Sequence, residues 1–139
     1  MATIEDGRLN IYNLPLHKSK KGYRAMPVHN IDLGEKIKFH QVRWLPFGSF
    51  NMLAVTDFLS NVFLFKDGRL FKTYLNAHAK LITDLCWFFT YDHGEKEPVP
   101  YFATSSMDGA LKLWSLTDQF VPLFDHLTSK ASIFSMLII

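Results

Sequence analysis

Residues 76–116 decide how this chain folds: they read NAHAKLITDLCWFFTYDHGEKEPVPYFATSSMDGALKLWSL. An apolar-rich segment from Ile82 to Trp87 is followed by a polar loop, and a second apolar run begins at Tyr101. The dipeptide Asp108-Gly109 then precedes leucines that alternate with polar residues around Trp114. Asp-Gly beside alternating apolar residues is the strongest short-range signal for a β-hairpin. The stretch therefore predicts three short strands with two turns between them.

The same stretch resembles a WD repeat. That family has a His before the first strand of its unit, a Ser or Thr on the second, an Asp near the tight turn and a Trp on the third. The matching residues here are His78, Thr104, Asp108 and Trp114. The resemblance implies a buried structural relay, because these four groups can satisfy one another where water is excluded and each would be costly alone. The competing interpretation is an accidental His and a surface Asp.

Two earlier segments align with the second and third strands of this unit. Residues 2–14 and 53–66 match residues 102–116, which places aromatic side chains at one shared position: Tyr12, Phe65 and Trp114. These three residues are separated by 53 and 49 positions. WD repeats usually recur every 40–45 residues or so. The extra length can be assigned to two loops, residues 16–23 and 90–100.

We therefore predict an all-β chain that forms a partial WD40-type β-propeller. About two complete four-stranded blades are expected, together with flanking partial blades. The first partial blade lacks its first strand and has its outer strand at 25–33, and the outer strand of the last complete blade is expected at 120–124. The blade boundaries are 1–36 for a partial blade, 37–76 and 77–126 for complete blades, and 127–139 for the first strand of a next blade.

The expected blades cannot close a ring, since complete β-propellers have typically 4–8 blades. Two flanking faces, rich in Phe and Leu, are expected to be uncovered. The chain is then expected to be a fragment of a longer protein or the product of a truncated transcript. The alternative is an open fan that dimerises to cover its faces.

The blade over residues 37–76 departs from the pattern. It has no His before its first strand, and Leu59 stands where the turn Asp would be. Its polar relay is therefore expected to be absent, and its core should rest on packing alone.

Composition narrows the class of protein. The chain has 139 residues, 48% of them hydrophobic, with 13 Phe, which excludes a disordered chain and favours strands. The net charge of +2 predicts no strong attraction of the whole chain to nucleic acid. A single cysteine, Cys86, rules out an internal disulfide and a cysteine-based zinc site. No run approaches the roughly 18 apolar residues that span a bilayer, so no membrane partner is expected.

No catalytic signature is present. The sequence contains no HExxH, no G-x-S-x-G elbow, no Gly-rich phosphate loop and no kinase motif. The six His residues include no pair at helical spacing. We therefore expect no enzyme activity, no catalytic residue, no cofactor and no metal site.

The sequence contains one local cluster of basic residues. Lys18, Lys20 and Lys21 lie close together, with Arg24 just after them. One interpretation is a solvated linker. The sharper interpretation is a phosphate contact or a weak nuclear-import signal, so these four residues are the candidate contacts to nucleic acid.

Within the WD-repeat proteins, the chain is similar to the WD-repeat (beta) subunits of TFIIIC, the general transcription factor for RNA polymerase III genes. A departure is that those subunits have an Arg- or Lys-rich turn and a Trp-Asp pair after Asp108, where this chain has Gly109, Ala110 and Trp114-Ser115. The segments that carry the resemblance are residues 6–15, 75–78 leading to 85–87, and 111–116 running on to 121–123.

The resemblance implies a non-catalytic scaffold for protein–protein interaction in the nucleus. Its partners would be other protein subunits of a transcription factor complex, with DNA contacted mainly through that complex. The alternatives are a generic WD-repeat adaptor in another complex, located in the cytoplasm, or a propeller that contacts nucleic acid through its basic loop at 18–24.

Overall fold

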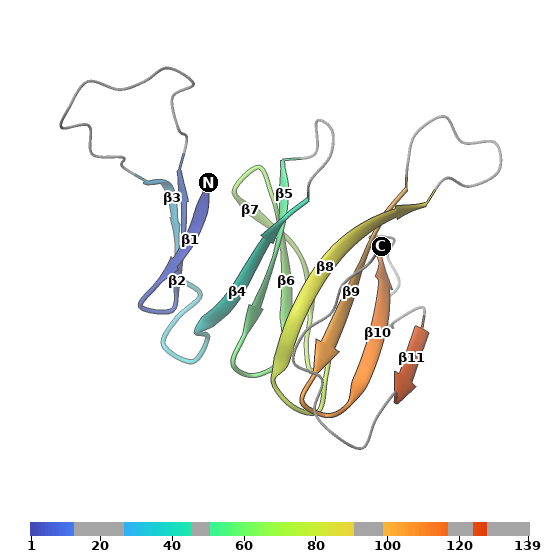
Figure 1. The fold of residues 1–139 in the computed structure, drawn as a ribbon. Helices are drawn as coiled ribbons and strands as arrows, with labels where there is room; N and C mark the ends of the chain where they lie inside the picture. The colour runs from blue at the N-terminus through green and yellow to red at the C-terminus, as the bar shows by residue number, and fades with distance from the viewer. Residues whose placement is uncertain (13–26, 46–50, 91–98, 117–123, 128–139) are drawn as a thin grey trace, which may run out of the picture.

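The computed structural model describes residues 1–12, 27–45, 51–90, 99–116 and 124–127. Strands and turns make up these residues, and the strands form three antiparallel sheets that stand side by side (Figure 1). The all-β class is therefore confirmed. Within the described residues, no helix has the length and apolar character needed to cross a bilayer.

The first sheet, sheet A, has the strand order β1-β2-β3. Its strands are β1 (Ala2–Glu5), β2 (Arg8–Tyr12) and β3 (Pro27–Ile31). The turn between β1 and β2 is Asp6-Gly7, with φ of 51° and 74°. Two left-handed residues are what a two-residue hairpin turn requires. Among the described strands, none pairs with the free edge of β1.

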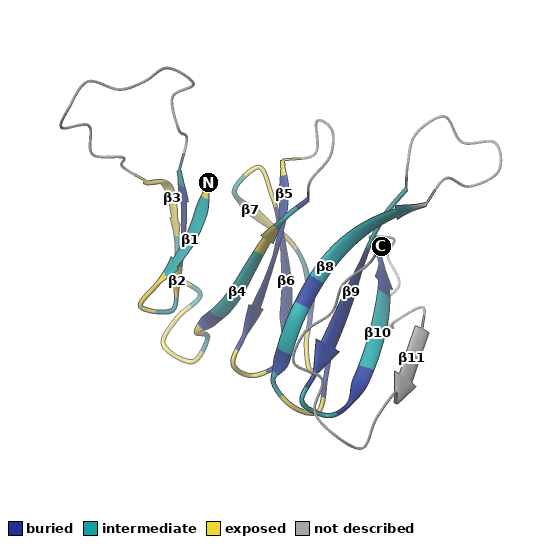
Figure 2. Cartoon of the chain, viewed as in Figure 1, coloured by how far each residue is buried: buried dark blue, intermediate teal, exposed yellow. Residues whose placement is uncertain are grey.

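The second sheet, sheet B, is a four-stranded meander in the order β4-β5-β6-β7. Its strands are β4 (Phe39–Trp44), β5 (Met52–Asp57), β6 (Val62–Lys66) and β7 (Arg69–Tyr74). Every residue of β5 and all but the last of β6 are buried (Figure 2). These near-continuous apolar strands are expected where a sheet is covered on both faces.

The third sheet, sheet C, has the order β11-β10-β9-β8. Its strands are β8 (Ile82–Thr90), β9 (Val99–Ser106), β10 (Ala110–Ser115) and β11 (Phe124–Leu127). The outer strand was expected at 120–124; the structure describes it at Phe124–Leu127, with Leu113 paired with Phe124 and Ala110 with Leu127, and residues 120–123 lie outside the described residues.

The turn at Asp108-Gly109 is longer than the dipeptide predicts. Three residues separate β9 from β10, and in this turn only Gly109 has a left-handed backbone, with φ of 83°. The other two Asp-Gly dipeptides are true two-residue turns, since Asp67 and Gly68 have φ of 51° and 75°, like Asp6-Gly7. The hairpin is present, but its turn has three residues instead of the two that the dipeptide predicts.

Two apolar cores hold the sheets together. One lies between sheets A and B and includes Leu9, Phe39 and Phe65. The other lies between sheets B and C and is built around Phe102 and Trp114, whose rings stack with centroids 5.8 Å apart. Each core forms because alternate residues of a strand point to one face of its sheet.

Side-chain donors also tie sheet C to sheet B. Four of them reach backbone carbonyl oxygens across the junction. The bonds are Gln41 Nε2 to Thr83 O (2.6 Å), Ser60 Oγ to Lys80 O (2.5 Å), Tyr74 Oη to Ser115 O (2.9 Å) and Trp87 Nε1 to Arg43 O (3.3 Å). Burial raises the pKa of Tyr74 to about 12, so this donor keeps its proton at neutral pH.

The strand registers place residues of sheets B and C at corresponding positions. Trp114 lies opposite Phe102, as Phe65 lies opposite Leu53. By the same count Val55 corresponds to Thr104, and the turn 57–60 corresponds to the turn 106–109. Sheet B therefore carries Val55 and Phe65 where sheet C carries Thr104 and Trp114.

The two outer faces of the assembly differ in polarity. Ala2, Ile4, Leu9 and Ile11 of sheet A pack toward sheet B. Alternation therefore turns their neighbours outward, and these include Thr3 and Glu5. The expectation that the outer face is rich in Phe and Leu is wrong for sheet A, because the apolar side chains of this sheet face the core that it shares with sheet B. The side of sheet C that faces away from sheet B carries Phe88 stacked on Tyr101, together with Leu111 and Leu113, and all four are half-buried.

Candidate interaction surface at the turn end

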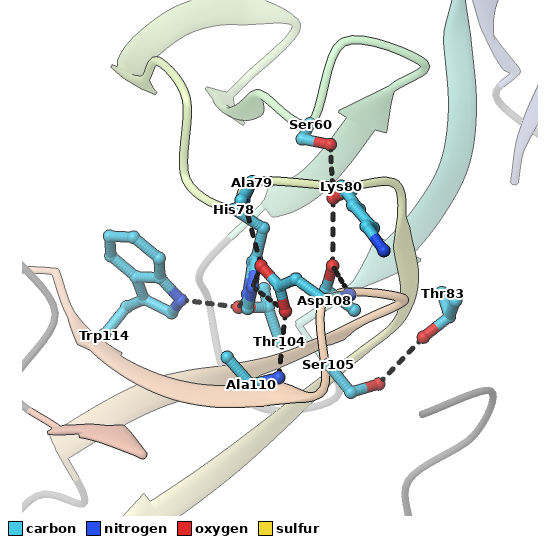
Figure 3. Close-up of polar contacts among 11 residues, drawn as sticks. Ser60, His78, Ala79, Lys80, Thr83, Thr104, Ser105, Asp108, Ala110 and Trp114 are labelled. Atoms are coloured by element: carbon cyan, nitrogen blue, oxygen red, sulfur yellow. Dashed lines mark hydrogen bonds and ion pairs between the residues drawn. The ribbon is translucent and has the colours of Figure 1, made fainter. Parts of the chain in front are cut away.

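Four side chains of sheet C and its approach loop form a hydrogen-bonded chain (Figure 3). Trp114 Nε1 donates to Thr104 Oγ1 over 2.8 Å, and His78 Nε2 lies 2.8 Å from the same oxygen. On the other side of the ring, His78 Nδ1 lies 3.1 Å from Asp108 Oδ2. The structure thus brings together all four residues of the expected relay.

One arrangement of protons satisfies every member of this chain. A carboxylate only accepts hydrogen bonds, so His78 Nδ1 must donate to Asp108. In the neutral imidazole Nε2 is then an acceptor, and the Thr104 hydroxyl donates to it while accepting from Trp114. The direction runs from the indole through the hydroxyl and the ring to the carboxylate, with no buried donor left over.

Asp108 anchors the relay to the backbone. Its Oδ2 accepts from Ala79 N–H and its Oδ1 from Ala110 N–H, both over 2.9 Å. Burial alone would raise the pKa of this carboxyl, but the two amide hydrogen bonds together with His78 outweigh it and lower the pKa below 3.8. The carboxylate therefore stays ionised and fixes the loop before β8 against the turn after β9.

The network continues from sheet C to the turn of sheet B. Asp108 N–H donates to Ser106 Oγ over 3.1 Å, and Ser106 Oγ donates to the Lys80 carbonyl over 2.9 Å. Ser60 Oγ donates to the same carbonyl. One backbone oxygen therefore joins the corresponding turns of two sheets (Figure 3).

Sheet B holds its own turn by a different polar device. Asp57 is fully buried, and its Oδ1 accepts from Leu59 N–H (2.9 Å) and Asn61 N–H (2.8 Å). Asn61 Nδ2 donates to Asp57 Oδ2 over 2.7 Å, and Asn61 Oδ1 accepts from Asn76 N–H over 2.9 Å. The expectation that this core rests on packing alone is wrong. Sheet B has no His–Thr–Trp hydrogen-bonded chain in its described residues; the buried Asp57 carboxylate holds its turn instead.

A hollow of about 580 Å³ opens between these two turns. His78 and Ser60 are among its lining residues, so the relay and the turn of sheet B both border it. The lining contains two charged residues, both lysines, and no carboxylate side chain. The lining residues are Phe58, Leu59, Ser60, Asn76, His78, Ala79, Lys80, Leu81 and Lys112.

Two large apolar side chains stand at the rim of this hollow. Phe58 is 58% exposed and Leu59 is 59% exposed, although their turn is fixed by the buried Asp57. The Phe58 ring also contacts the His40 ring, with centroids 4.7 Å apart. Sequence reasoning missed this rim, because it treated Leu59 only as the residue that replaces an Asp. Two adjacent apolar residues in an otherwise polar turn were the available signal.

The other expected site residues cannot be placed. Lys18, Lys20, Lys21 and Arg24 lie outside the described residues, as do residues 128–139 of the expected next strand. In the part of the chain that the structure describes, no three His, Cys, Asp or Glu side chains gather in a way that could hold a metal ion. Burial raises the pKa of Cys86 to about 11, with the Asp84 charge adding to this shift and Arg43 opposing it.

No protein-family model matches the chain. No curated protein matches it significantly either.

Proposed function

We propose that this chain is part of a WD40-type β-propeller that serves as a non-catalytic scaffold for protein–protein interaction, as a subunit of a TFIIIC-like transcription factor complex. The observation that carries the proposal is the hydrogen-bonded chain Trp114–Thr104–His78–Asp108. It supports a WD-type sheet because these residue types, at these places in a meander, are the pattern that the sequence resembles. The nucleus is the corresponding location, with DNA contacted through other subunits.

The hollow at the turn end is the contact surface that we assign to this function. Exposed apolar side chains on a rigid base are typical of interaction sites, since they lose little conformational freedom on binding. Phe58 and Leu59 supply the apolar contact, and Lys80 and Lys112 supply positive charge. The chemistry therefore favours a partner segment with an apolar anchor and neighbouring carboxylates.

Co-purification with the other subunits of TFIIIC tests this proposal. We expect Leu59→Ser and Lys80→Glu each to weaken the association about tenfold, which corresponds to ~1.4 kcal/mol. Leu75→Ser is the matched apolar control, since Leu75 is 68% exposed but does not line the hollow. Lys36→Glu is the charge control, because Lys36 is exposed outside it. No association of the unaltered chain with any subunit would contradict the proposal.

Direct binding of nucleic acid is the competing function, and it rests on the basic loop at 18–24. The double substitution Lys20→Glu and Lys21→Glu separates the two. If the loop makes the contact, the variant loses affinity for DNA and its salt dependence becomes flatter. If the scaffold proposal holds, the variant keeps its protein partners at full strength.

A further inference from the structure

Two like charges lie directly opposite each other where β6 joins β7. Lys66 pairs with Arg69 across the two-residue turn Asp67-Gly68. Both side chains are exposed, and within the described residues neither forms an ion pair, even with the neighbouring Asp67. Like charges at directly opposite positions destabilise a sheet. The described contacts of the chain do not offset this repulsion, so the pair calls for an anion from outside the chain.

Two exposed apolar side chains follow these charges on the edge strand β7. Leu70 is 48% exposed and Phe71 is 52% exposed. The pairing with β6 skips from Leu70 to Lys72, so Phe71 between them is the extra residue of a β-bulge. A bulge re-aims a side chain and makes an edge strand a poor template for open-ended pairing. The side chains of this edge are therefore better suited to binding than a long run of its backbone is.

Leu70 also offers its backbone groups. A two-residue turn makes Lys66 and Arg69 a hydrogen-bonded pair, and such pairs alternate with non-hydrogen-bonded pairs in an antiparallel ladder. Leu70 comes next, so its N–H and C=O point away from β6, toward the edge of the sheet. Among the described strands, none pairs with this edge. One residue of a partner segment can therefore exchange two hydrogen bonds with Leu70.

The turn that carries the two cations is fixed in place. Asp67 N–H donates to the carbonyl of Asn51, just before β5, over 2.9 Å. The His29 ring of β3 lies so close that a Cβ on Gly68 would stand 2.5 Å from it. Contacts with two other segments thus hold the turn, and a ligand would bind with little further ordering of the backbone.

A hollow of about 390 Å³ joins these features, and its lining residues are Lys66, Asp67, Arg69, Leu70 and Phe71. We propose that it binds an extended acidic segment of a partner protein, with a carboxylate between the two cations and an apolar side chain against the two apolar residues. A carboxylate in that position offsets the repulsion across the turn. A phosphate would meet the same cations, but the aliphatic Leu70 has no ring on which a base can stack, so the apolar pair favours a peptide.

This surface is separate from the hollow at the turn end. The turn 57–60 joins β5 to β6, whereas Asp67-Gly68 joins β6 to β7, so the two turns lie at opposite ends of β6 (Figure 1). The chain can then hold two partner segments at once. The peptide site rests on the hairpin alone and is independent of the assignment to a transcription factor.

Fluorescence anisotropy of a labelled peptide, titrated with the full chain, tests this site. The probe is a short peptide of alternating Val and Glu, and its counterpart alternates Val and Lys. We expect the Glu peptide to bind about tenfold more tightly at low salt, with a difference that shrinks as salt screens the charges. Phe71→Ser should weaken binding of the Glu peptide about tenfold, because it removes an exposed apolar anchor.

Arg69→Glu is the decisive variant, because its expected effects on binding and on stability have opposite signs. It should weaken binding of the Glu peptide about tenfold, and it should raise the midpoint of thermal unfolding because opposite charges then face each other across the turn. Loss of binding by unfolding is thereby excluded. Lys36→Glu and Leu75→Ser are the matched controls, since both residues are exposed outside the hollow, and both should keep the unaltered affinity.

Three results would overturn the proposed site. They are no binding of the Glu peptide, equal affinity for the two peptides, and binding that Lys36→Glu weakens as much as Arg69→Glu does. Binding of single-stranded oligo-dT in place of the peptide, lost in Arg69→Glu, would assign the surface to nucleic acid and overturn it as well. Co-purification with transcription-factor subunits decides the scaffold function separately.

Discussion

Trp114 donates its indole N–H to Thr104 Oγ1 over 2.8 Å, and the neighbouring sheet fills the two corresponding positions with Phe65 and Val55. The same place in two packed sheets therefore holds a hydrogen-bonded pair in one and an apolar pair in the other. Replacing both partners of a buried hydrogen bond can be nearly neutral, whereas removing one strands the other. Because sheet C has the hydrogen-bonded pair and sheet B the apolar pair, substitutions in sheet C can test whether one pair can replace the other.

Thr104→Val should lower the free energy of unfolding by about 1–3 kcal/mol for each of the two groups, Trp114 Nε1 and His78 Nε2, that lose their shared partner. The double variant Thr104→Val with Trp114→Phe recreates the pair found in sheet B. We expect it to be less destabilised than the sum of the two single variants, by at least about 0.5 kcal/mol. Urea unfolding of the four proteins measures this. Additive effects would mean that the two side chains act independently.

The free energy of unfolding should depend on pH through Asp108. Its pKa is lowered in the folded chain, so its contribution is present above the ordinary value of 3.8 and is lost as pH falls through and below that value. Asp108→Asn should lower stability at neutral pH and reduce the loss of stability in acid. Asp32→Asn is the control, since this residue is exposed in its ion pair with Arg8. Equal acid slopes for the unaltered chain and Asp108→Asn would refute the assignment.

The buried Asp57 carboxylate of sheet B should contribute more to the free energy of unfolding than the exposed Asp32 carboxylate does. Asp57→Ala leaves the buried Asn61 N–H and Asn61 Nδ2 without their acceptor, and each buried unpaired group costs about 1–3 kcal/mol. Asp32→Ala removes an exposed ion pair and should cost less than about 1 kcal/mol. Thermal unfolding compares the two. A similar loss for both variants would indicate that the turn of sheet B finds other acceptors.

Cys86 should react slowly with thiol reagents. Its pKa of about 11 leaves little thiolate at pH 8, and the thiolate is the reactive form. Labelling by iodoacetamide should be far slower in the folded chain than in urea, and it should accelerate as pH rises toward 11. Rapid labelling of the folded chain at pH 7 would contradict the burial of this thiol. Cys86→Ser is the control, because it removes the single cysteine and should not be labelled.

Much of the strand pattern could be predicted because it depends on local chemistry. The segment 53–66, matched to residues 102–116 by its aromatic position, covers most of β5 and all of β6, and the predicted blade 37–76 contains all four strands of sheet B. The four relay residues were also recognisable, since a His, a hydroxyl, an Asp and a Trp carry distinctive donors and acceptors. Each of these signals is contained within a few neighbouring residues.

The features that sequence reasoning missed depend on contacts that form only in the folded chain. Asp57 resembles a solvated turn residue, and its burial follows from three donors that converge on it. The described outer strand of sheet C, Phe124–Leu127, is set by its pairing with β10, which the sequence around Phe124 does not reveal. The polar outer face of sheet A could not be deduced without knowing which neighbour its apolar residues face.

Four of the polar ties between sheets B and C end on backbone carbonyls. Every residue type supplies a carbonyl, so exchanges at Thr83 or Ser115 leave the acceptors in place. The donors Gln41 and Tyr74 have no such freedom, because each must keep its own side chain to reach across. Sequence drift should therefore be tolerated at the four residues that supply these carbonyls and restricted at the four that supply the side-chain donors.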